Sequence, residues 1–314
     1  MTTLCDELLA ECPQDDHARA RLGLGAALRA LALDAHSSVI DEVLLDVQIA
    51  ECDRRLHAQL DQILHHPRVQ ALEAAWRGLA LVVERVDFDE NIRVEVLHCS
   101  KQDLLDDFAE ASELPRSGLY QIVYARAIGT YGADPYGLLC ADFDFGPGAE
   151  DVSLLRQCAA VAAMAHAPFI ANVNPDLFHL PDFTTLPRLR DFPAALAGPR
   201  LRVWDALRTN EDARYLGLCL PRVLLRQPHD FHTDPSTPLP YRETITHHRE
   251  LLWGRPSYVF ALLAAGSFAR HRWCVHILGS RAAASADQQR WDYPSLGGLW
   301  QRPPLECLIS ARVE

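Results

Sequence analysis

Apolar residues at helical spacing dominate the first quarter of the chain. Over residues 39–64 they recur every three or four positions and predict one helix with a single apolar face: Leu45, Ile49, Cys52, Leu56, Leu60 and Ile63. A second helix is predicted over 68–85, after Pro67, with its own apolar face: Val69, Leu72, Trp76, Leu79 and Val83.

A shorter helix is predicted upstream, over residues 15–33. Asp15 or Asp16 is suited to cap it, and Leu24, Leu28 and Leu31 recur at helical spacing. Two glycines weaken it, so we expect it to form fully against a partner. Residues 34–38 read as a linker.

The pattern then alternates between strands and helices. Alternating apolar and charged residues predict a half-buried strand over 92–96, and Ser100 is placed to cap a helix that runs to about Phe108. Further strands are predicted over 119–128, 136–143 and 168–173, with a helix over 151–167. A strand, a helix and a strand in this order predict a parallel βαβ unit.

From residue 174 onward, the sequence predicts further loops, helices and strands of an α/β protein. Residues 174–200 predict a structured loop region with short helices, and 228–240 and 280–304 predict loops. Helices are predicted over 201–215 and 250–273, strands over 216–226 and 306–314, and a short apolar segment over 275–278. The expected fold is a mixed sheet with packed helices, preceded by an N-terminal helical arm.

The amino-acid composition and net charge argue against several classes of function. The 314 residues are 49% hydrophobic and 23% charged, as in ordinary globular proteins, and the net charge is −12. This charge argues against nucleic-acid and anionic-membrane binding, which reward clustered Lys and Arg. The nine cysteines include no CxxC pair and predict core thiols in a reducing compartment. Neither a secretory signal nor a membrane-length apolar run is present, so we expect a cytoplasmic location.

The most suggestive local motif is FDFGPGAEDVSLL at 143–155, because a strand runs through Gly146-Pro147-Gly148 into a helix. Such a loop can cradle a phosphate. However, Asp151 replaces the third glycine, and Pro147 has no N–H to donate. An acidic cap on the helix is therefore the favoured interpretation.

Other constellations are weaker. Asp134, Asp142 and Asp144 suggest either a divalent-metal site or the solvent face of a strand, and the second is favoured. The pairs at 65–66 and 247–248 are both His-His and lack metal-ligand spacing. No GxSxG elbow exists. Arg202, Arg208 and the segment 211–215 favour ion pairing or a subunit contact over binding of an anionic substrate.

His166 has two interpretations. It lies in the last turn of the helix predicted over 151–167, two residues before Pro168. A histidine there can bond the last free carbonyls and face the negative end of the helix dipole. A catalytic base would need a carboxylate or a nucleophile within reach. The structural role is favoured.

Several stretches together resemble one family. They are AAWRGLALVVERVDFDENIRVEVLHCSKQDLLDDF (74–108), SGLYQIVY (117–124), AMAHAPFI (163–170), NEDARYLGLCLPRVLLR (210–226), LWG (252–254), SFARHRWC (267–274) and LECLIS (305–310). In this order they resemble the large subunit of the type VI secretion contractile sheath, the TssC or VipB family.

The resemblance implies a structural protein without a cofactor, not an enzyme. Such a subunit pairs with a smaller one, TssB or VipA, and stacks with neighbouring subunits into a cytoplasmic sheath around a tube of Hcp rings. Contraction of the sheath expels the tube and delivers effectors. The unfoldase ClpV reads the N-terminal helix, which corresponds here to 15–33 with the partner-binding residues Leu22, Leu24, Leu28 and Leu31. The motif residues with an implied structural role are Trp76, Arg77, Gly78, His166, Pro168, Glu211, Asp212, Arg214, Tyr215, Trp253, Gly254, Arg272, Trp273 and Cys274.

The chain also departs from the family pattern. We expect an arm over 1–38 and a sheath-type α/β domain over 39–314 that lacks the family's C-terminal, tube-facing part, because relatives continue beyond the segment resembling LISAR (308–312). Residues 280–304 also lack a glycine-rich run of relatives. These departures place Hcp contact in question. They leave a truncated remnant or a free-standing protein-binding module as the alternative, and an enzyme using His166 as a third hypothesis.

Overall fold

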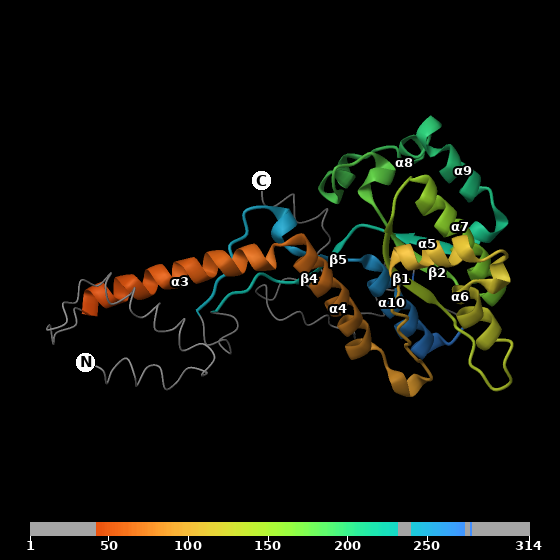
Figure 1. Ribbon diagram of the computed structural model, residues 1–314, viewed down its shortest axis with the longest axis horizontal. Coiled ribbons are helices and arrows are strands. Elements are labelled where there is room, and N and C mark those ends of the chain that lie inside the picture. Colours follow the sequence, from red (N-terminus) through yellow and green to blue (C-terminus); the bar gives the residue numbers. More distant parts are fainter. Residues whose placement is uncertain (1–41, 232–239, 274–276, 278–314) are drawn as a thin grey trace. The chain divides into compact units, whose positions relative to one another are not determined.

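The computed structural model describes residues 42–231, 240–273 and 277 (Figure 1). The chain divides into two compact units, one within residues 1–64 and 229–244 and the other within 65–228 and 245–314. The predictions made for 1–38, for Cys274, for most of 275–278 and for 280–314 lie outside the described residues.

The described part of the first unit contains one long helix, α3 (Glu42–Leu64), which confirms the helix predicted over 39–64. The chain on either side of 232–239 is joined by an antiparallel bridge between Asp230 and Arg242. From this region Tyr241 donates its hydroxyl to Asp61 Oδ1 at 2.5 Å, and the Tyr241 ring lies edge-on to His57 at 5.5 Å. These contacts hold Tyr241 against one flank of α3.

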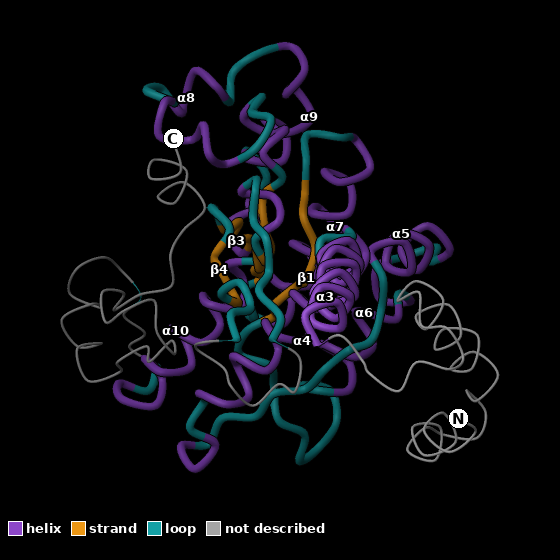
Figure 2. Tube along the Cα trace, turned by 90° about the vertical axis from the view of Figure 1, so that its left-hand side faces the viewer, coloured by secondary structure: helices purple, strands orange, loops and turns teal. Residues whose placement is uncertain are grey.

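The second unit is organised around a parallel three-stranded sheet (Figure 2). Its strands are β1 (Leu139–Phe145), β2 (Phe169–Val173) and β3 (Leu216–Cys219), in the order β1-β2-β3. The helix α7 (Ala149–Ala165) connects β1 to β2, which confirms the predicted βαβ unit and its parallel pairing.

Both faces of this sheet are covered. Every residue of β2 is buried, as expected for a parallel strand between two helical layers. Phe169, Ala171 and Val173 belong to the same core as the buried face of α7. On the other face, Asn172 bonds Ser257 at the start of α10 (Pro256–His271).

A second, two-stranded sheet pairs β4 (Val223–Arg226) with β5 (Leu252–Gly254) in antiparallel fashion. It packs with α4 (Pro67–Arg85) and α10 around a separate core that includes Ala74, Leu81, Val82, Val223, Leu225, Leu252 and Leu262. The single strand predicted over 216–226 is therefore wrong in one respect. It breaks at Pro221, which cannot donate to a ladder, and its halves join different sheets.

The other helices are α5 (Lys101–Glu110), α6 (Gly118–Tyr120) with a π-helical continuation (Gln121–Arg126), α8 (Phe192–Ala195) and α9 (Arg202–Arg208). Short 3-10 helices cover 88–90, 114–116, 175–178, 183–188, 199–201, 211–215 and 248–250. Ser100 caps α5 as predicted, since its hydroxyl accepts the Asp103 N–H while the Asp103 carboxylate accepts the Ser100 N–H.

The strand predicted over 119–128 is wrong, because this segment is helical. The Asp107 carboxylate accepts the N–H groups of Gly118 and Leu119, at 2.7 and 3.2 Å, and so caps the new helix from α5. Leu119 and Val123, one helical turn apart, are both buried. Burial of one helical face therefore outweighs the β propensity of the aromatic and branched residues in this segment.

The strand predicted over 92–96 is also wrong. The segment is extended but belongs to neither sheet of the described residues, and Val94 and Val96 are exposed. Its polar residues are held by side chains instead, since Arg93 bonds Asp134 and Glu95 bonds Tyr136. The alternating pattern indicated the backbone conformation but not a neighbouring strand.

Candidate functional site

Helix α4 carries apolar residues on two faces, and only one of them packs within the second unit. The buried face consists of Ala74, Gly78, Leu81 and Val82. Leu72, Trp76 and Val83 are 62%, 66% and 46% exposed, and we call these three residues the α4 stripe. The sequence placed these residues together on one apolar face of the helix. The smaller opposite face is the one that meets α10 and the second sheet.

Gly78 explains why the smaller face is chosen. A methyl group built on Gly78 would lie 2.5 Å from a ring carbon of Tyr258 on α10. The glycine therefore lets the aromatic ring approach the α4 backbone, and the interlocking leaves Trp76 directed away from this contact. A close contact of the same kind occurs in the second sheet, where a methyl group on Gly254 would lie 2.2 Å from Leu225 Cδ1.

Arg77 takes part in an ion-pair chain across this core. Its Nε lies 2.7 Å from Glu73 Oε1, and the same oxygen accepts from Nε of Arg226 at 2.8 Å. The Arg226 side chain is only 8% exposed, so Glu73 is the counter-ion that permits its burial. Arg77 is thus the exposed end of this chain of ion pairs.

A buried polar junction joins α10 to the three-stranded sheet, and sequence reasoning missed it. Asn172 on β2 is 1% exposed. Its amide nitrogen donates to the carbonyl oxygens of Ala141 and Phe143 at 3.1 and 3.2 Å and to Ser257 Oγ at 3.0 Å. Its oxygen accepts the Ser257 N–H at 2.9 Å. The one available signal was an amide inside the apolar run FIANV.

The aspartates of β1 complete this junction. Asp142 and Asp144 lie 2.9 and 3.2 Å from the two terminal nitrogens of Arg255. They do not form the solvent face of the strand, which corrects the favoured prediction, because Arg255 at the start of α10 covers them. Burial raises the pKa of Asp142, although Arg255 opposes this effect. Within the described residues, no three His, Cys, Asp or Glu side chains gather to hold a metal ion.

The Gly146-Pro147-Gly148 loop is occupied by its own helix. The Gly146 N–H donates to Asp151 Oδ2 at 2.6 Å, and the other oxygen of Asp151 lies 2.6 Å from Lys101 Nζ. The donor that a phosphate would need is thus already bonded to a carboxylate. This geometry agrees with the acidic-cap interpretation.

His166 ends α7, as predicted, in a left-handed conformation with φ of 53°. Its backbone N–H, not its ring, bonds the carbonyls of Ala162 and Ala163. The ring is exposed, and its Nδ1 lies 3.0 Å from the Tyr215 hydroxyl, which corrects the expectation that the ring bonds free carbonyls. Within the described residues, no carboxylate is hydrogen-bonded to His166. The Pro168 carbonyl accepts the Leu139 N–H at 2.9 Å where β1 and β2 begin.

Tyr215 closes a short 3-10 helix, Glu211–Tyr215, that packs on α7. Asn210 caps it by accepting the Asp212 N–H at 3.0 Å, and Arg214 lies over the Tyr215 ring at 5.4 Å. The ion pairing suggested for Arg202, Arg208 and Arg214 is not seen within the described residues. The 3-10 helix that contains Glu211 and Asp212 therefore positions the Tyr215 hydroxyl beside the His166 ring.

The remaining motif residues lie near the ends of β5 and α10. Trp253 donates its indole N–H to the His248 carbonyl at 2.7 Å, and Arg272 pairs with Glu90 at 2.7 Å. Trp273 is 82% exposed, with its ring edge-on to Phe268. Neither histidine pair forms a metal site: His66 caps α4, and His248 Nε2 lies 3.6 Å from Asp182.

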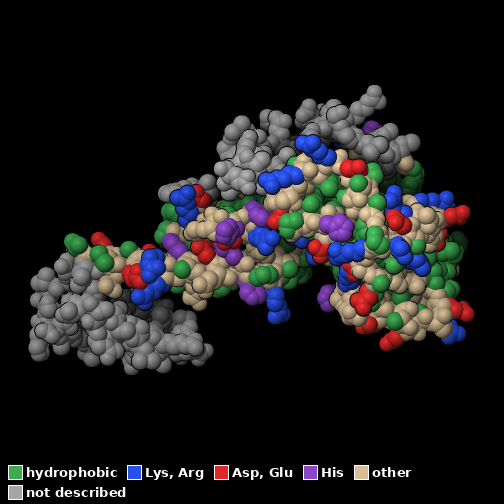
Figure 3. All heavy atoms as spheres, turned by 90° about the horizontal axis from the view of Figure 1, so that it is seen from above, with side chains coloured by type: hydrophobic (Ala, Val, Ile, Leu, Met, Phe, Trp, Pro, Cys, Tyr) green, Lys and Arg blue, Asp and Glu red, His purple; other side chains and the backbone are tan. Residues whose placement is uncertain are grey.

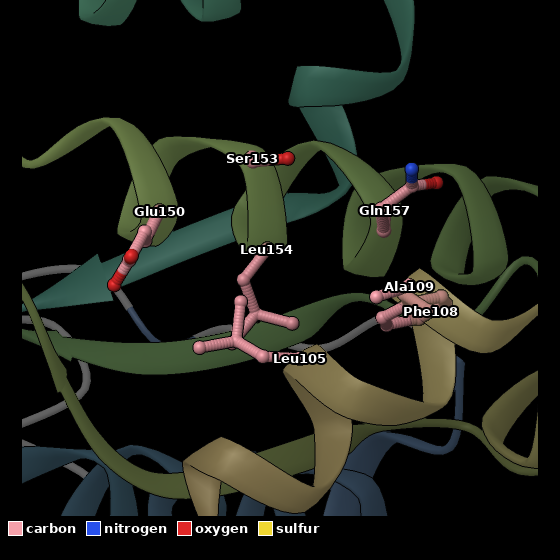
Figure 4. Close-up of a pocket in the computed structure, with 7 residues that line it drawn as sticks. All are labelled: Leu105, Phe108, Ala109, Glu150, Ser153, Leu154 and Gln157. Carbon is pink, nitrogen blue, oxygen red and sulfur yellow. The ribbon is translucent and has the colours of Figure 1, made fainter.

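A shallow groove of about 210 Å³ runs between α5 and α7 (Figure 4). Leu105 and Leu154 point toward one another across it, while Glu150 and Gln157 lie toward opposite ends. Its lining contains one carboxylate and no histidine, cysteine or basic group: Leu105, Phe108, Ala109, Glu150, Ser153, Leu154 and Gln157. Such a lining suits an apolar contact better than acid–base chemistry.

None of the helices in the described ranges combines the length and apolarity that crossing a bilayer requires. Among the described residues, the α4 stripe is an exposed apolar surface, and such surfaces are typical of sites that contact other proteins.

Comparison with known proteins gives a consistent assignment. Residues 46–314 match the VipB family model, described as "EvpB/VC_A0108, tail sheath N-terminal domain". The chain is 32% identical over 308 residues to the type VI secretion system sheath protein TssC1 of Pseudomonas aeruginosa (strain PAO1). The match covers 94% of this chain and 62% of that protein, so the chain spans less than two thirds of the length of this relative. This chain therefore belongs to the VipB/TssC family of type VI secretion sheath proteins.

Proposed function

We propose that this chain is a structural subunit of a type VI secretion sheath and that it assembles with the small sheath subunit, TssB or VipA, through the α4 stripe. The sheath would enclose the Hcp tube in the cytoplasm and contract to deliver effectors. The chain acts by contact and not by catalysis.

The single observation that carries the proposal is the exposure of the α4 stripe. A helix with apolar residues on two faces is typical of a helix buried on both sides. Trp76 and Leu72 lie one turn apart and are both more than half exposed. Tryptophan is enriched among the residues that contribute most to interface affinity. Family membership points to another sheath subunit as the protein that covers them.

The proposal extends to recycling and domain organisation. Residues 15–33, with Leu22, Leu24, Leu28 and Leu31, would form the helix that the ClpV unfoldase reads, within an arm over 1–38. Residues 39–314 would form the sheath domain. Binding of a peptide covering 15–33 to purified ClpV N-terminal domain tests this part separately.

The main test is binding of the full chain to a purified small subunit. Trp76→Ala should cost about 2 kcal/mol of binding free energy, or roughly a 30-fold rise in Kd. Leu72→Ser combined with Trp76→Ala should abolish co-elution in size-exclusion chromatography. Glu84→Gln changes an exposed residue of the same helix and should bind like the wild type.

Two results would count against the proposal. If the wild-type chain shows no affinity for the small subunit, it is a free-standing module. If it binds equally well with and without Trp76, the interface lies elsewhere. Circular dichroism should show unchanged folding in all variants, because the α4 stripe is exposed.

A further inference from the structure

Arg77 lies at the rim of the α4 stripe, and its side chain is 46% exposed. It directly follows Trp76, so it lies about 100° round the helix from that residue, between the stripe and the buried face. Its Nε lies 2.7 Å from Glu73 Oε1, one turn earlier on α4. Its two terminal nitrogens form no hydrogen bond or ion pair with the described residues. This end of the guanidinium is therefore open to a bound protein.

The carboxylate that holds Arg77 is itself fixed by a buried strand. Glu73 is 19% exposed, and its Oε1 also accepts from Nε of Arg226 on β4 at 2.8 Å. Arg226 is anchored in turn, because its Nη1 donates to the Gln227 carbonyl at 2.9 Å. Arg77 is thus tied to the core of the second unit. A side chain held in this way loses less conformational entropy when a partner binds it.

Charge beside an apolar surface does not by itself mark a binding group. Figure 3 shows charged and apolar side chains next to one another over much of the surface drawn in colour. Two other exposed side chains of α4, those of Arg68 and Glu84, form no hydrogen bond or ion pair with the described residues, so no such contact fixes their orientation. Anchoring, and not charge alone, therefore distinguishes Arg77.

We infer that Arg77 sets the partner specificity of the α4 interface by binding a carboxylate of the small sheath subunit beside the site that receives Trp76; this inference rests on the proposed function. The carboxylate belongs to an Asp or Glu side chain of that subunit. A planar guanidinium donates two parallel N–H···O bonds to a carboxylate, and the terminal nitrogens of Arg77 can form this pair. Two guanidinium groups share Glu73, so a second carboxylate at Arg77 adds a favourable ion pair.

The same geometry discriminates between partner surfaces. A surface without an acid at this position would cover Arg77 and leave its charge desolvated and unpaired, which disfavours binding. Because Glu73 holds the guanidinium in one place, the acid is required at one position of the partner and not merely somewhere near the stripe. The α4 stripe thus supplies apolar contact area, and Arg77 selects the partner.

Calorimetric titration of the full chain with the purified small subunit, at several NaCl concentrations, tests the inference. Arg77→Gln should raise Kd about tenfold and flatten the dependence of log Kd on log salt concentration, because an ion pair is lost. Arg68→Gln is the matched control, since it removes the same charge from an exposed position of the same helix that no side-chain contact anchors. It should bind like the wild type and keep the wild-type salt dependence.

A double-mutant cycle locates the carboxylate. Each Asp and Glu of the small subunit is replaced in turn by Asn or Gln, and each variant is titrated with the wild-type chain and with the Arg77→Gln chain. We expect one replacement to weaken binding of the wild-type chain about tenfold and to have no further effect on the Arg77→Gln chain. Arg77→Lys keeps the charge but not the planar fork, and should recover only part of the lost affinity.

The failures of this inference and of the proposed function are distinguishable. If Arg77→Gln binds like the wild type while Trp76→Ala binds weakly, this inference is overturned and the proposed function stands. An equal loss from Arg68→Gln, the absence of any replacement coupled to Arg77, or full recovery with Arg77→Lys also overturns it. A wild-type chain that does not bind the small subunit overturns both. Circular dichroism should show unchanged folding in each variant, because Glu73 still pairs with Arg226 when Arg77 is replaced.

Discussion

Replacing Asn172 by aspartate tests whether the polar junction holds α10 on the sheet. The change is nearly isosteric, but it replaces an NH₂ group by an oxygen. That NH₂ donates to two backbone carbonyls and to Ser257 Oγ, at 3.0 to 3.2 Å. A carboxylate oxygen would instead face two carbonyl oxygens in a site that is 1% exposed.

The expected cost is large for a single substitution. Both N–H donors of the amide are lost from its three buried acceptors, and a charge is buried without a partner, which together cost about 3–5 kcal/mol. For a chain of this size, this corresponds to a fall in Tm of about 5–8 °C. The hydrogen bond from the Ser257 N–H to the other oxygen survives, so the loss comes from the donor side.

Asn174→Asp is the matched control, two residues further along the chain. The Asn174 oxygen accepts the Asp176 N–H and caps a 3-10 helix, which a carboxylate does equally well. Urea unfolding followed by circular dichroism should show N174D within about 0.5 kcal/mol of the wild type. If N172D also stays within about 1 kcal/mol, the junction does not contribute as argued.

Two further predictions concern packing and pH. Gly78→Ala should destabilise the fold by about 1–3 kcal/mol in thermal melting, since its methyl group meets the Tyr258 ring and overpacking outweighs the gain in helix propensity. Gly137→Ala, with no atom within 4 Å, should melt like the wild type, and equal behaviour of the two variants would refute the packing argument. Burial raises the pKa of Cys158 from 9.0 to about 12, so the folded chain keeps a proton that the unfolded chain loses above pH 9.0, and stability should fall between these values. Cys158→Ala should show a shallower decrease of the urea midpoint above pH 9.0 than the wild type, and identical slopes would contradict this.

Local signals predicted much of the fold. Ser100 and His166 mark helix ends where the sequence placed them, because capping depends on residues within one turn. The βαβ unit from β1 to β2 follows from the order of its apolar runs. In these segments local preference and tertiary packing agree.

The failures occur where a distant partner decides the outcome. The face of α4 that packs is set by the approach of Tyr258 to Gly78, some 180 residues apart in the sequence. The helix at 118–126 is set by the Asp107 carboxylate and by burial of Leu119 and Val123. Spacing alone cannot show which of two apolar faces meets a partner.

In the candidate site, too, the sequence identified residues but not the distant contacts that they make. The motif residues were identified through their resemblance to a family, but their contacts were not predicted. Asn172 and Ser257 carry no motif, and only the structure brings them together. The α4 stripe was identified as apolar from its spacing, but only the structure shows that it is exposed.

The division of residues 216–226 between two sheets has a mechanical consequence. Strands β3 and β4 are separated by only three residues, 220–222. A force applied to one sheet would therefore reach the other through a short segment of backbone that can extend very little. Helix α10 contacts all three strands of the parallel sheet, and its Leu262 lies in the core beside the second sheet, so the second unit should yield to force as one body rather than sheet by sheet. If the chain assembles into a contracting sheath as proposed, this unit would transmit strain instead of absorbing it.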